Sequence, residues 1–430
     1  MQKGIVTATL IVISVVTFIK YDFLGLIFFL LVLLVLETGT RVLVTTLRKD
    51  FQWLITKDDE YPELSEQGLR KFIEHGYDRE LGWVRKPNTQ KKEMGKEGLT
   101  LYHIDETGSR RNPGHEQLAQ KISLYGDSFI FGRQVNDNES IQWYLSELTK
   151  SNVLNFGVGN YGLDQALLRL KREYAKNKTP IVIMGVVPST LVRILAVWKH
   201  YNEFGNTFGF KPRFILEQGM LHLVPNIIDD ESKFPRYREY LPEIQKYDFF
   251  YRTKFKKEMI VAPYFVSVMA NPSRNMRLLW LVAVDKWLRK AKQMQETYAP
   301  PMKVIMDVNL KLRVKLFTNS DAVHLLVKII EGFKEYASQQ GFRPVFLWMP
   351  QKDDILLVRS KKSFYYQNLI DLISKKMVVI DLTNDLLKHS DLDSLYSDDN
   401  QYGGHFGKQG SKVVAEIVHR KLLDADIVKP

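Results

Sequence analysis

The chain has 430 residues, of which 45% are hydrophobic, 26% charged and 12% aromatic, a composition typical of a folded protein with two or three domains. It contains no cysteine, which excludes disulfides, thiolate metal sites and a cysteine nucleophile. The 61 lysines and arginines outnumber the 49 aspartates and glutamates, and the formal charge of +12 favours anionic partners such as lipid headgroups or acidic glycans. We expect no nucleic-acid partner, because net charge is the only feature that points to one.

Two uncharged apolar runs, residues 4–19 and 23–36, are separated by a short segment that contains Lys20 and Asp22. A single helix through both runs would bury these two charges in a bilayer, so we predict a tight helical hairpin that crosses the membrane. The apolar stretch is too long for a cleaved signal peptide, and no small-residue cleavage site follows it. Residues 1–37 are therefore predicted to form a retained transmembrane anchor.

Basic residues around the anchor bear on which side of the membrane the rest of the chain lies. Lys3 precedes the first run and Arg41, Arg48 and Lys49 follow the second, whereas the turn carries one lysine beside one aspartate. By the positive-inside rule, this pattern places both ends of the chain in the cytoplasm.

Residues 38–75 are predicted to form a linker with an amphipathic helix, and from about residue 76 apolar strands alternate with amphipathic helices. This alternation indicates an α/β fold with a doubly wound parallel sheet over 76–194 and 319–430. Residues 195–318 interrupt it and are interpreted as an insertion, whose aromatic and basic residues either stack on a sugar chain or pack in a core. The expected strands are 101–104, 122–125, 152–156, 181–187, 344–349 and 377–382, and the expected helices are about 140–150, 164–177, 320–340, 364–375 and 408–423.

The ligand crevice of an open parallel sheet lies beyond the carboxyl ends of its strands, so the residues that follow each strand are the candidates for function. Gly126, Asp127 and Ser128 follow the first of the alternating strands. A serine on such a turn raises its hydroxyl into the crevice, where a histidine can accept its proton while a carboxylate orients the imidazole. Ser128, His405 and Asp399 fit these three roles. The nine histidines lack the spacing of a metal cluster, so we expect no metal and no cofactor.

The run Leu-Tyr-Gly-Asp-Ser-Phe-Ile-Phe-Gly at 124–132 and the Gly-Gly-His at 403–405 together resemble the SGNH (GDSL-type) hydrolases. The resemblance implies a three-layer, flavodoxin-like α/β fold with Ser128 as the nucleophile and His405 as the base. The family's Asp-x-x-His spacing would put Tyr402 at the position of the triad acid. Asp399 is therefore our choice for the acid, with Asp398 as the alternative.

The family resemblance also implies an oxyanion hole, at which this chain departs from the usual pattern. The second block has Gly159 followed by Asn160, so the Asn160 backbone N–H is expected to donate, in a conformation with positive φ that asparagine tolerates. The third block has Ser189 where the family has asparagine. Loss of an oxyanion donor can lower the rate by ~10²–10³. Either Ser189 replaces the asparagine as donor, or the enzyme uses an unusual acyl acceptor, or the enzyme is slow.

The resemblance implies a membrane-anchored serine esterase or O-acyltransferase. We expect it to act on an acylated carbohydrate, with acetyl as the expected acyl group, and to pass that group to water or to a sugar hydroxyl. An SGNH domain behind a hydrophobic segment resembles those that act on cell-envelope or exported polysaccharides. This resemblance favours an extracytoplasmic domain, whereas the charge pattern favours a cytoplasmic one. The side of the membrane on which the domain lies therefore stays open. The alternative is a catalytically silent SGNH domain that serves as a glycan-binding or assembly subunit of a membrane complex. The departures from the family pattern in the second and third blocks motivate this alternative.

Overall fold

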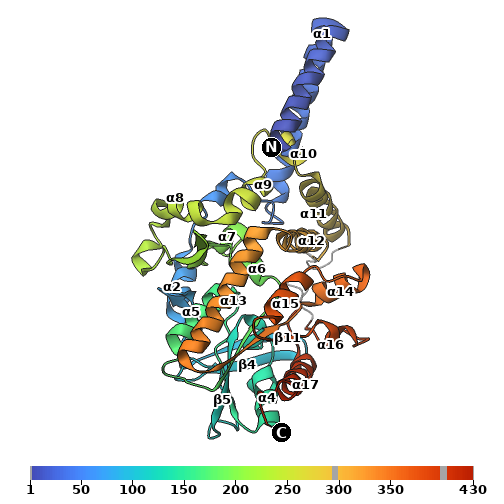
Figure 1. Ribbon diagram of the computed structural model, residues 1–430. Coiled ribbons are helices and arrows are strands. Elements are labelled where there is room, and N and C mark those ends of the chain that lie inside the picture. Colours follow the sequence, from blue (N-terminus) through green and yellow to red (C-terminus); the bar gives the residue numbers. More distant parts are fainter. Residues whose placement is uncertain (1, 293–298, 398–403, 430) are drawn as a thin grey trace. The chain divides into compact units, whose positions relative to one another are not determined.

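The computed structural model describes residues 2–292, 299–397 and 404–429 (Figure 1). It divides into two compact units, each built from two separate parts of the chain. The first unit comprises Met1–Glu63 and Phe250–Asn309, and the second comprises Leu64–Phe249 and Leu310–Pro430. Residues 195–318, which we expected to form one insertion, are shared between the two units.

The first unit begins with α1 (Gln2–Leu47), a helical element with two apolar segments. These segments, Gln2–Tyr21 and Phe23–Leu47, are long and apolar enough to cross a membrane, and neither apolar window is buried within the protein. Each segment is longer than the uncharged run inside it. The first reaches ~30 Å at 1.5 Å per residue, which matches the hydrocarbon thickness of a bilayer.

α1 reverses direction between its two apolar segments. The Lys3 ammonium donates to the Met259 carbonyl oxygen at 3.4 Å, and the Glu37 carboxylate accepts the Tyr264 N–H at 2.7 Å. Met259 and Tyr264 are at most ~18 Å apart along an extended chain. A straight helix would separate Lys3 from Glu37 by ~51 Å. The first turn of α1 accordingly lies near α10 (Tyr264–Met269) in Figure 1, and the predicted helical hairpin is confirmed.

Apolar side chains join the end of α1 to the second part of the same unit. They come from α1, the segment that follows it, α11 (Pro272–Lys292) and α12 (Ala299–Leu316). The buried cluster includes Val44, Leu47, Phe51, Leu54, Leu278, Leu279, Val282, Val304 and Ile305. Burial of these side chains supplies the main stabilising term for this unit.

The second unit is built around a five-stranded parallel sheet, as the alternating pattern predicted. In space the strands follow the order β11-β10-β7-β5-β6. Their bounds are β5 (Gln120–Gly126), β6 (Asn152–Asn155), β7 (Ile181–Val186), β10 (Arg343–Trp348) and β11 (Val378–Asp381). From β5 the chain adds β6 on one side and then β7, β10 and β11 on the other. The order of the strands therefore reverses between β5 and β7, and the crevice of a doubly wound sheet lies at this switch point.

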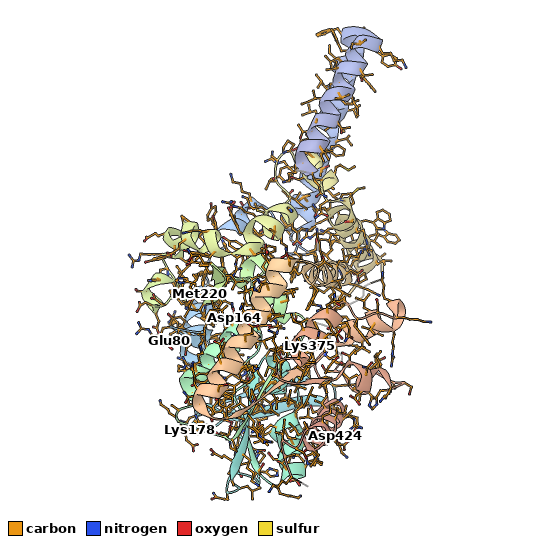
Figure 2. The ribbon with its side chains drawn as sticks, in the orientation of Figure 1. Glu80, Asp164, Lys178, Met220, Lys375 and Asp424 are labelled. Atoms are coloured by element: carbon orange, nitrogen blue, oxygen red, sulfur yellow. The ribbon has the colours of Figure 1, made fainter. Side chains whose placement is uncertain are left out.

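Helices cover both faces of the sheet (Figure 1). On one face α4 (Ile141–Thr149) packs against α17 (Lys408–Asp424), and on the other α5 (Leu163–Glu173) packs against α13 (Ser320–Gln340). Ile122 and Leu124 of β5 belong to the cluster that includes apolar side chains of α4 and α17. Lys178 lies just before β7, and Asp424 lies at the end of α17. Both are labelled in Figure 2 and mark the amino-terminal edge of the sheet.

The described part of the second unit also contains shorter helices and three two-stranded sheets. Within the predicted linker and amphipathic helix of 38–75, residues 38–47 continue α1 and a separate helix begins at Glu66. The further described elements are α2 (Glu66–His75), β1 (Tyr77–Asp78), β2 (Gly82–Trp83), β3 (Thr89–Gly95), β4 (Gly98–Ile104), α3 (Ser128–Phe131), α6 (Thr190–Arg193), α7 (Lys199–Asn202), β8 (Arg213–Glu217), β9 (Met220–Val224), α8 (Tyr237–Tyr247), α14 (Lys352–Lys361), α15 (Gln367–Ser374) and α16 (Thr383–Leu387).

Candidate active site

The turn between β5 and α3 positions Ser128. β5 ends at Gly126, and a Cβ atom at that position would lie 1.9 Å from the Gly185 carbonyl oxygen on the neighbouring strand β7. Only glycine allows so close an approach of the two strands. Ser128 follows as the first residue of α3, with 3% of its surface exposed. The serine therefore sits at the carboxyl end of the sheet, at the switch point.

His405 lies beside this serine, 277 positions further along the chain. Its Nε2 atom is 2.8 Å from Ser128 Oγ. The His405 N–H donates to Ser397 Oγ at 3.1 Å, and its carbonyl oxygen accepts the Ser397 N–H at 2.7 Å. The imidazole also packs on the Phe129 ring, with 4.9 Å between the ring centroids. Backbone bonds and packing thus fix the imidazole against the hydroxyl.

Asp399 and Asp398, the two candidates for the acid, lie outside the described residues, as does Tyr402. The described residues on either side of this segment are close together, because Ser397 and His405 are joined by the backbone hydrogen bonds given above. The structure thus brings together two of the three residues expected in the triad, Ser128 and His405.

Asp127, the residue before the serine, has a bracing role that the sequence analysis missed. Its fully buried carboxylate accepts the N–H groups of Phe129 at 2.9 Å and Val187 at 3.2 Å, and it pairs with Arg193 Nη1 at 2.9 Å. The same Arg193 nitrogen donates to the Tyr161 carbonyl oxygen at 3.1 Å. Asp127 and Arg193 together therefore connect the loops that follow β5, β6 and β7. No sequence signal paired them, because they are 66 positions apart.

The second-block loop lies next to the serine turn, since the Val158 N–H donates to the Gly126 carbonyl oxygen at 3.0 Å. Asn160 has φ +66°, the conformation expected for it. Within the described parts of the chain, the N–H groups of Ser128, Gly159 and Asn160 donate to no protein atom. These three donors are free to bind an oxyanion.

Ser189, expected in the third block, lies directly before α6. Its Oγ is buried and has no hydrogen-bond partner among the residues that the structure describes. The hydroxyl of the next residue, Thr190, instead accepts the Leu163 N–H at 2.9 Å. Unpaired buried hydroxyl groups are uncommon in proteins, and an oxygen of a bound ligand would satisfy this one.

Other candidates from the sequence have structural roles. The aromatic residues that suggested sugar stacking in 195–318 include Trp198, Tyr201, Phe210 and Tyr237, all of which are buried and pack on one another. For these four, packing in the core is the role observed. In the described ranges no three histidine, aspartate or glutamate side chains form a group that could hold a metal ion.

No protein-family model matches the chain, and no curated protein matches it in sequence. Solved structures do match. One is a member of the lipolytic G-D-S-L family from Veillonella parvula, with 9% identity over 71% of this chain and 97% of that one, and a TM-score of 0.30. A lipase/acylhydrolase from Enterococcus faecalis has 12% identity over 72% and 98%, with a TM-score of 0.30. A catalytic mutant of an acetylxylan esterase from Geobacillus stearothermophilus has 11% identity over 73% and 96%, with a TM-score of 0.30. The solved structures to which this chain is similar thus include GDSL-type lipolytic proteins and an esterase.

Proposed function

We propose that this protein is an ester hydrolase of the SGNH type. The observation that carries the proposal is the 2.8 Å contact between Ser128 Oγ and His405 Nε2 at the carboxyl end of a doubly wound sheet. A hydroxyl and an imidazole at this distance can exchange a proton, and proton transfer turns a weak alcohol into a nucleophile. The free N–H groups beside Ser128 supply the second requirement, which is stabilisation of an oxyanion.

The reaction follows from these positions. Ser128 Oγ attacks the ester carbonyl carbon while its proton passes to His405 Nε2, and the carbonyl oxygen becomes an oxyanion. The backbone N–H groups of Ser128, Gly159 and Asn160 and the hydroxyl of Ser189 are the candidate donors to this oxyanion. The carbon–oxygen bond to the alcohol then breaks, and the alcohol leaves with the proton from His405. A water molecule then attacks the acyl carbon while it gives a proton to His405. The bond from that carbon to Ser128 Oγ breaks, His405 returns the proton to Oγ, and the acid leaves.

The triad acid is proposed to be Asp399, with Asp398 as the alternative. A carboxylate at His405 Nδ1 would hold the imidazole with its proton on Nδ1, so that Nε2 is free to accept the serine proton. The hydrogen bonds between Ser397 and the backbone of His405 support this assignment, because Ser397 directly precedes Asp398 in the chain.

The finer part of the proposal concerns the substrate and the location. We infer that the protein is anchored in a membrane by the two segments of α1 and that it removes an acyl group, acetyl above all, from a carbohydrate. Transfer of that group to a sugar hydroxyl is the same chemistry with another acceptor. The apolar helices of α1 and the net charge of +12 support a membrane location and an anionic environment.

A fluorophosphonate probe and p-nitrophenyl acetate test the proposed function. Wild-type protein is expected to react with the probe and to release p-nitrophenol, and both Ser128→Ala and His405→Ala should abolish these signals. Ser338→Ala is the matched control, because this serine lies exposed on α13. Absence of probe labelling and turnover in folded wild-type protein would favour the silent glycan-binding subunit instead.

A further inference from the structure

Arg85 lies beside α3, the helix that Ser128 begins. Its guanidinium carbon is 4.0 Å from the centroid of the Phe131 ring and 4.6 Å from that of Tyr102. Nη1 donates to the Tyr102 hydroxyl. These contacts hold the planar guanidinium in one orientation and leave Nε and Nη2 as its other donor nitrogens.

Arg110 lies against the same Phe131 ring, with 5.0 Å between its guanidinium carbon and the ring centroid, and provides a contrast. Its Nε donates to Asp137 at 3.0 Å, and its two Nη atoms donate to the carbonyl oxygens of Phe131 and Val135 at 2.7 Å each. Arg110 is fully buried, and its charge and donors are satisfied within the protein. Its role is to hold the loop that follows α3.

Arg85 has no such partners in the part of the chain that the structure describes. Among the described residues no carboxylate forms an ion pair with its guanidinium, its Nε is buried without a hydrogen bond, and its Nη2 donates to no protein atom. The nearby Glu93 is paired with Arg133 at 3.0 Å. Burial lowers the pKa of Arg85, although Tyr102 and Glu93 oppose this effect. A half-buried cation with unpaired donors is energetically costly, and an anionic ligand would offset that cost.

The free nitrogen of Arg85 faces the second-block loop. A Cβ atom built on Gly159 would lie 3.8 Å from Arg85 Nη2, with no other described atom outside the adjacent residues within 4 Å. Trp83, two residues before Arg85, donates from its indole nitrogen to the Gly159 carbonyl oxygen at 2.9 Å. Arg85 is therefore held at the same loop that carries the free N–H groups of the candidate oxyanion hole.

We propose that Arg85 binds an anionic group of the substrate, so that the preferred substrate is an acidic ester. This inference rests on the ester hydrolase proposed above. A guanidinium presents parallel N–H donors that match a carboxylate, and charge-assisted bonds of this kind are about twice as strong as neutral ones. The anion can belong to the acyl part of the ester or to its alcohol part, as in a uronic acid.

Two pairs of esters that differ in charge test the inference with the full-length protein in detergent. p-Nitrophenyl butyrate and p-nitrophenyl hemisuccinate compare a neutral and an anionic acyl group. O-Acetyl galactose and O-acetyl galacturonate compare a neutral and an anionic alcohol. Arg85→Gln should lower kcat/KM for the acidic ester of one pair about 10- to 100-fold more than for its neutral partner, and Arg85→Lys should recover part of that preference. The pair that responds shows which part of the ester carries the anion.

Arg111→Gln is the control, since it removes the same charge from an exposed arginine and should leave the ratios unchanged. An equal decrease in kcat/KM for acidic and neutral esters, or no decrease, would overturn the inference. A residue that acts on the oxyanion or on folding affects both kinds of ester alike. If the wild type hydrolyses none of the esters, the proposed function fails, and calorimetry still decides the role of Arg85. Ser128→Ala protein should then bind galacturonate but not galactose, and the added change Arg85→Gln should abolish that binding.

Discussion

The carboxylate of Asp127 and the guanidinium of Arg193 form a buried ion pair, with 2.9 Å between Oδ2 and Nη1, directly beside the serine of the candidate site. The aspartate next to the serine is therefore a brace that holds three loops. Both carboxylate oxygens of Asp127 accept hydrogen bonds, Oδ1 from Phe129 and Oδ2 from Val187 and Arg193, and none of these bonds involves His405.

Asp127→Asn should destabilise the protein, because it leaves Arg193 buried without its charge partner. Removal of one member of a buried pair costs about 3–5 kcal/mol. Urea unfolding of the second unit, followed by tryptophan fluorescence, measures this loss. Asp371→Asn, an exposed aspartate on α15, is the control and should change the free energy of unfolding by less than about 0.5 kcal/mol. Equal stability of the two variants would show that the pair does not brace the loops.

Ser397→Ala should lower kcat about 3- to 10-fold with little change in KM. The Ser397 hydroxyl donates to Gln134 Oε1 at 2.7 Å and accepts the His405 N–H, so its loss leaves the imidazole less well held. Steady-state kinetics on p-nitrophenyl acetate measure the effect, and Ser394→Ala, an exposed serine of the same segment, is the control. A change in KM alone would argue for a role in substrate binding.

Ser189→Ala should reduce kcat by about 10²-fold if the buried hydroxyl donates to the oxyanion. Ser189→Asn, which restores the side chain usual in the resembling family, should instead raise kcat about tenfold, because an amide reaches further. KM should change little in both variants, since the donor acts on charge that develops in the transition state. A slower Ser189→Asn enzyme with native unfolding behaviour would contradict the proposed geometry.

Gly126→Ala should prevent stable folding or cost more than about 3 kcal/mol, because the new Cβ would lie 1.9 Å from the Gly185 carbonyl oxygen. Gly341→Ala is the control that measures the cost of a positive φ alone, without a steric clash. Gly341 also has a positive φ of 78°, but a Cβ there meets no atom within 4 Å, so this control should cost only about 1 kcal/mol. Thermal unfolding of both variants gives the comparison.

Deletion of residues 2–36 should release the protein from membranes, because the apolar segments of α1 supply the energy of insertion. Membrane flotation of the full-length and shortened chains tests this. The shortened chain keeps Glu37, whose carboxylate accepts the N–H groups of Tyr264 and Phe265, and should retain the fold of the first unit. Flotation of the shortened chain with membranes would assign the attachment to another surface.

The main sheet was predictable because β5, β6, β7 and β10 are largely buried and appear as apolar runs between amphipathic helices. The antiparallel pair β3 and β4 was only partly predicted, since β3 is the polar run Thr-Gln-Lys-Lys-Glu-Met-Gly with no buried residue. In the candidate site, Ser128 and His405 were predictable from local patterns. The partners Arg85, Arg193 and Ser397 were not, because their roles depend on contacts between distant parts of the chain.

The division of the first unit has a consequence for the order in which the protein is made. Val44 and Leu47 are synthesised long before α10, α11 and α12, since the chain leaves this unit after Glu63 and returns only at Phe250. At ~5–20 residues per second the ribosome needs ~10–40 s to make the intervening residues. A nascent chain therefore presents an uncovered apolar surface next to its hydrophobic hairpin during that interval. Early insertion of the hairpin into a bilayer would protect it, and chains that stop before residue 250 should be prone to aggregation.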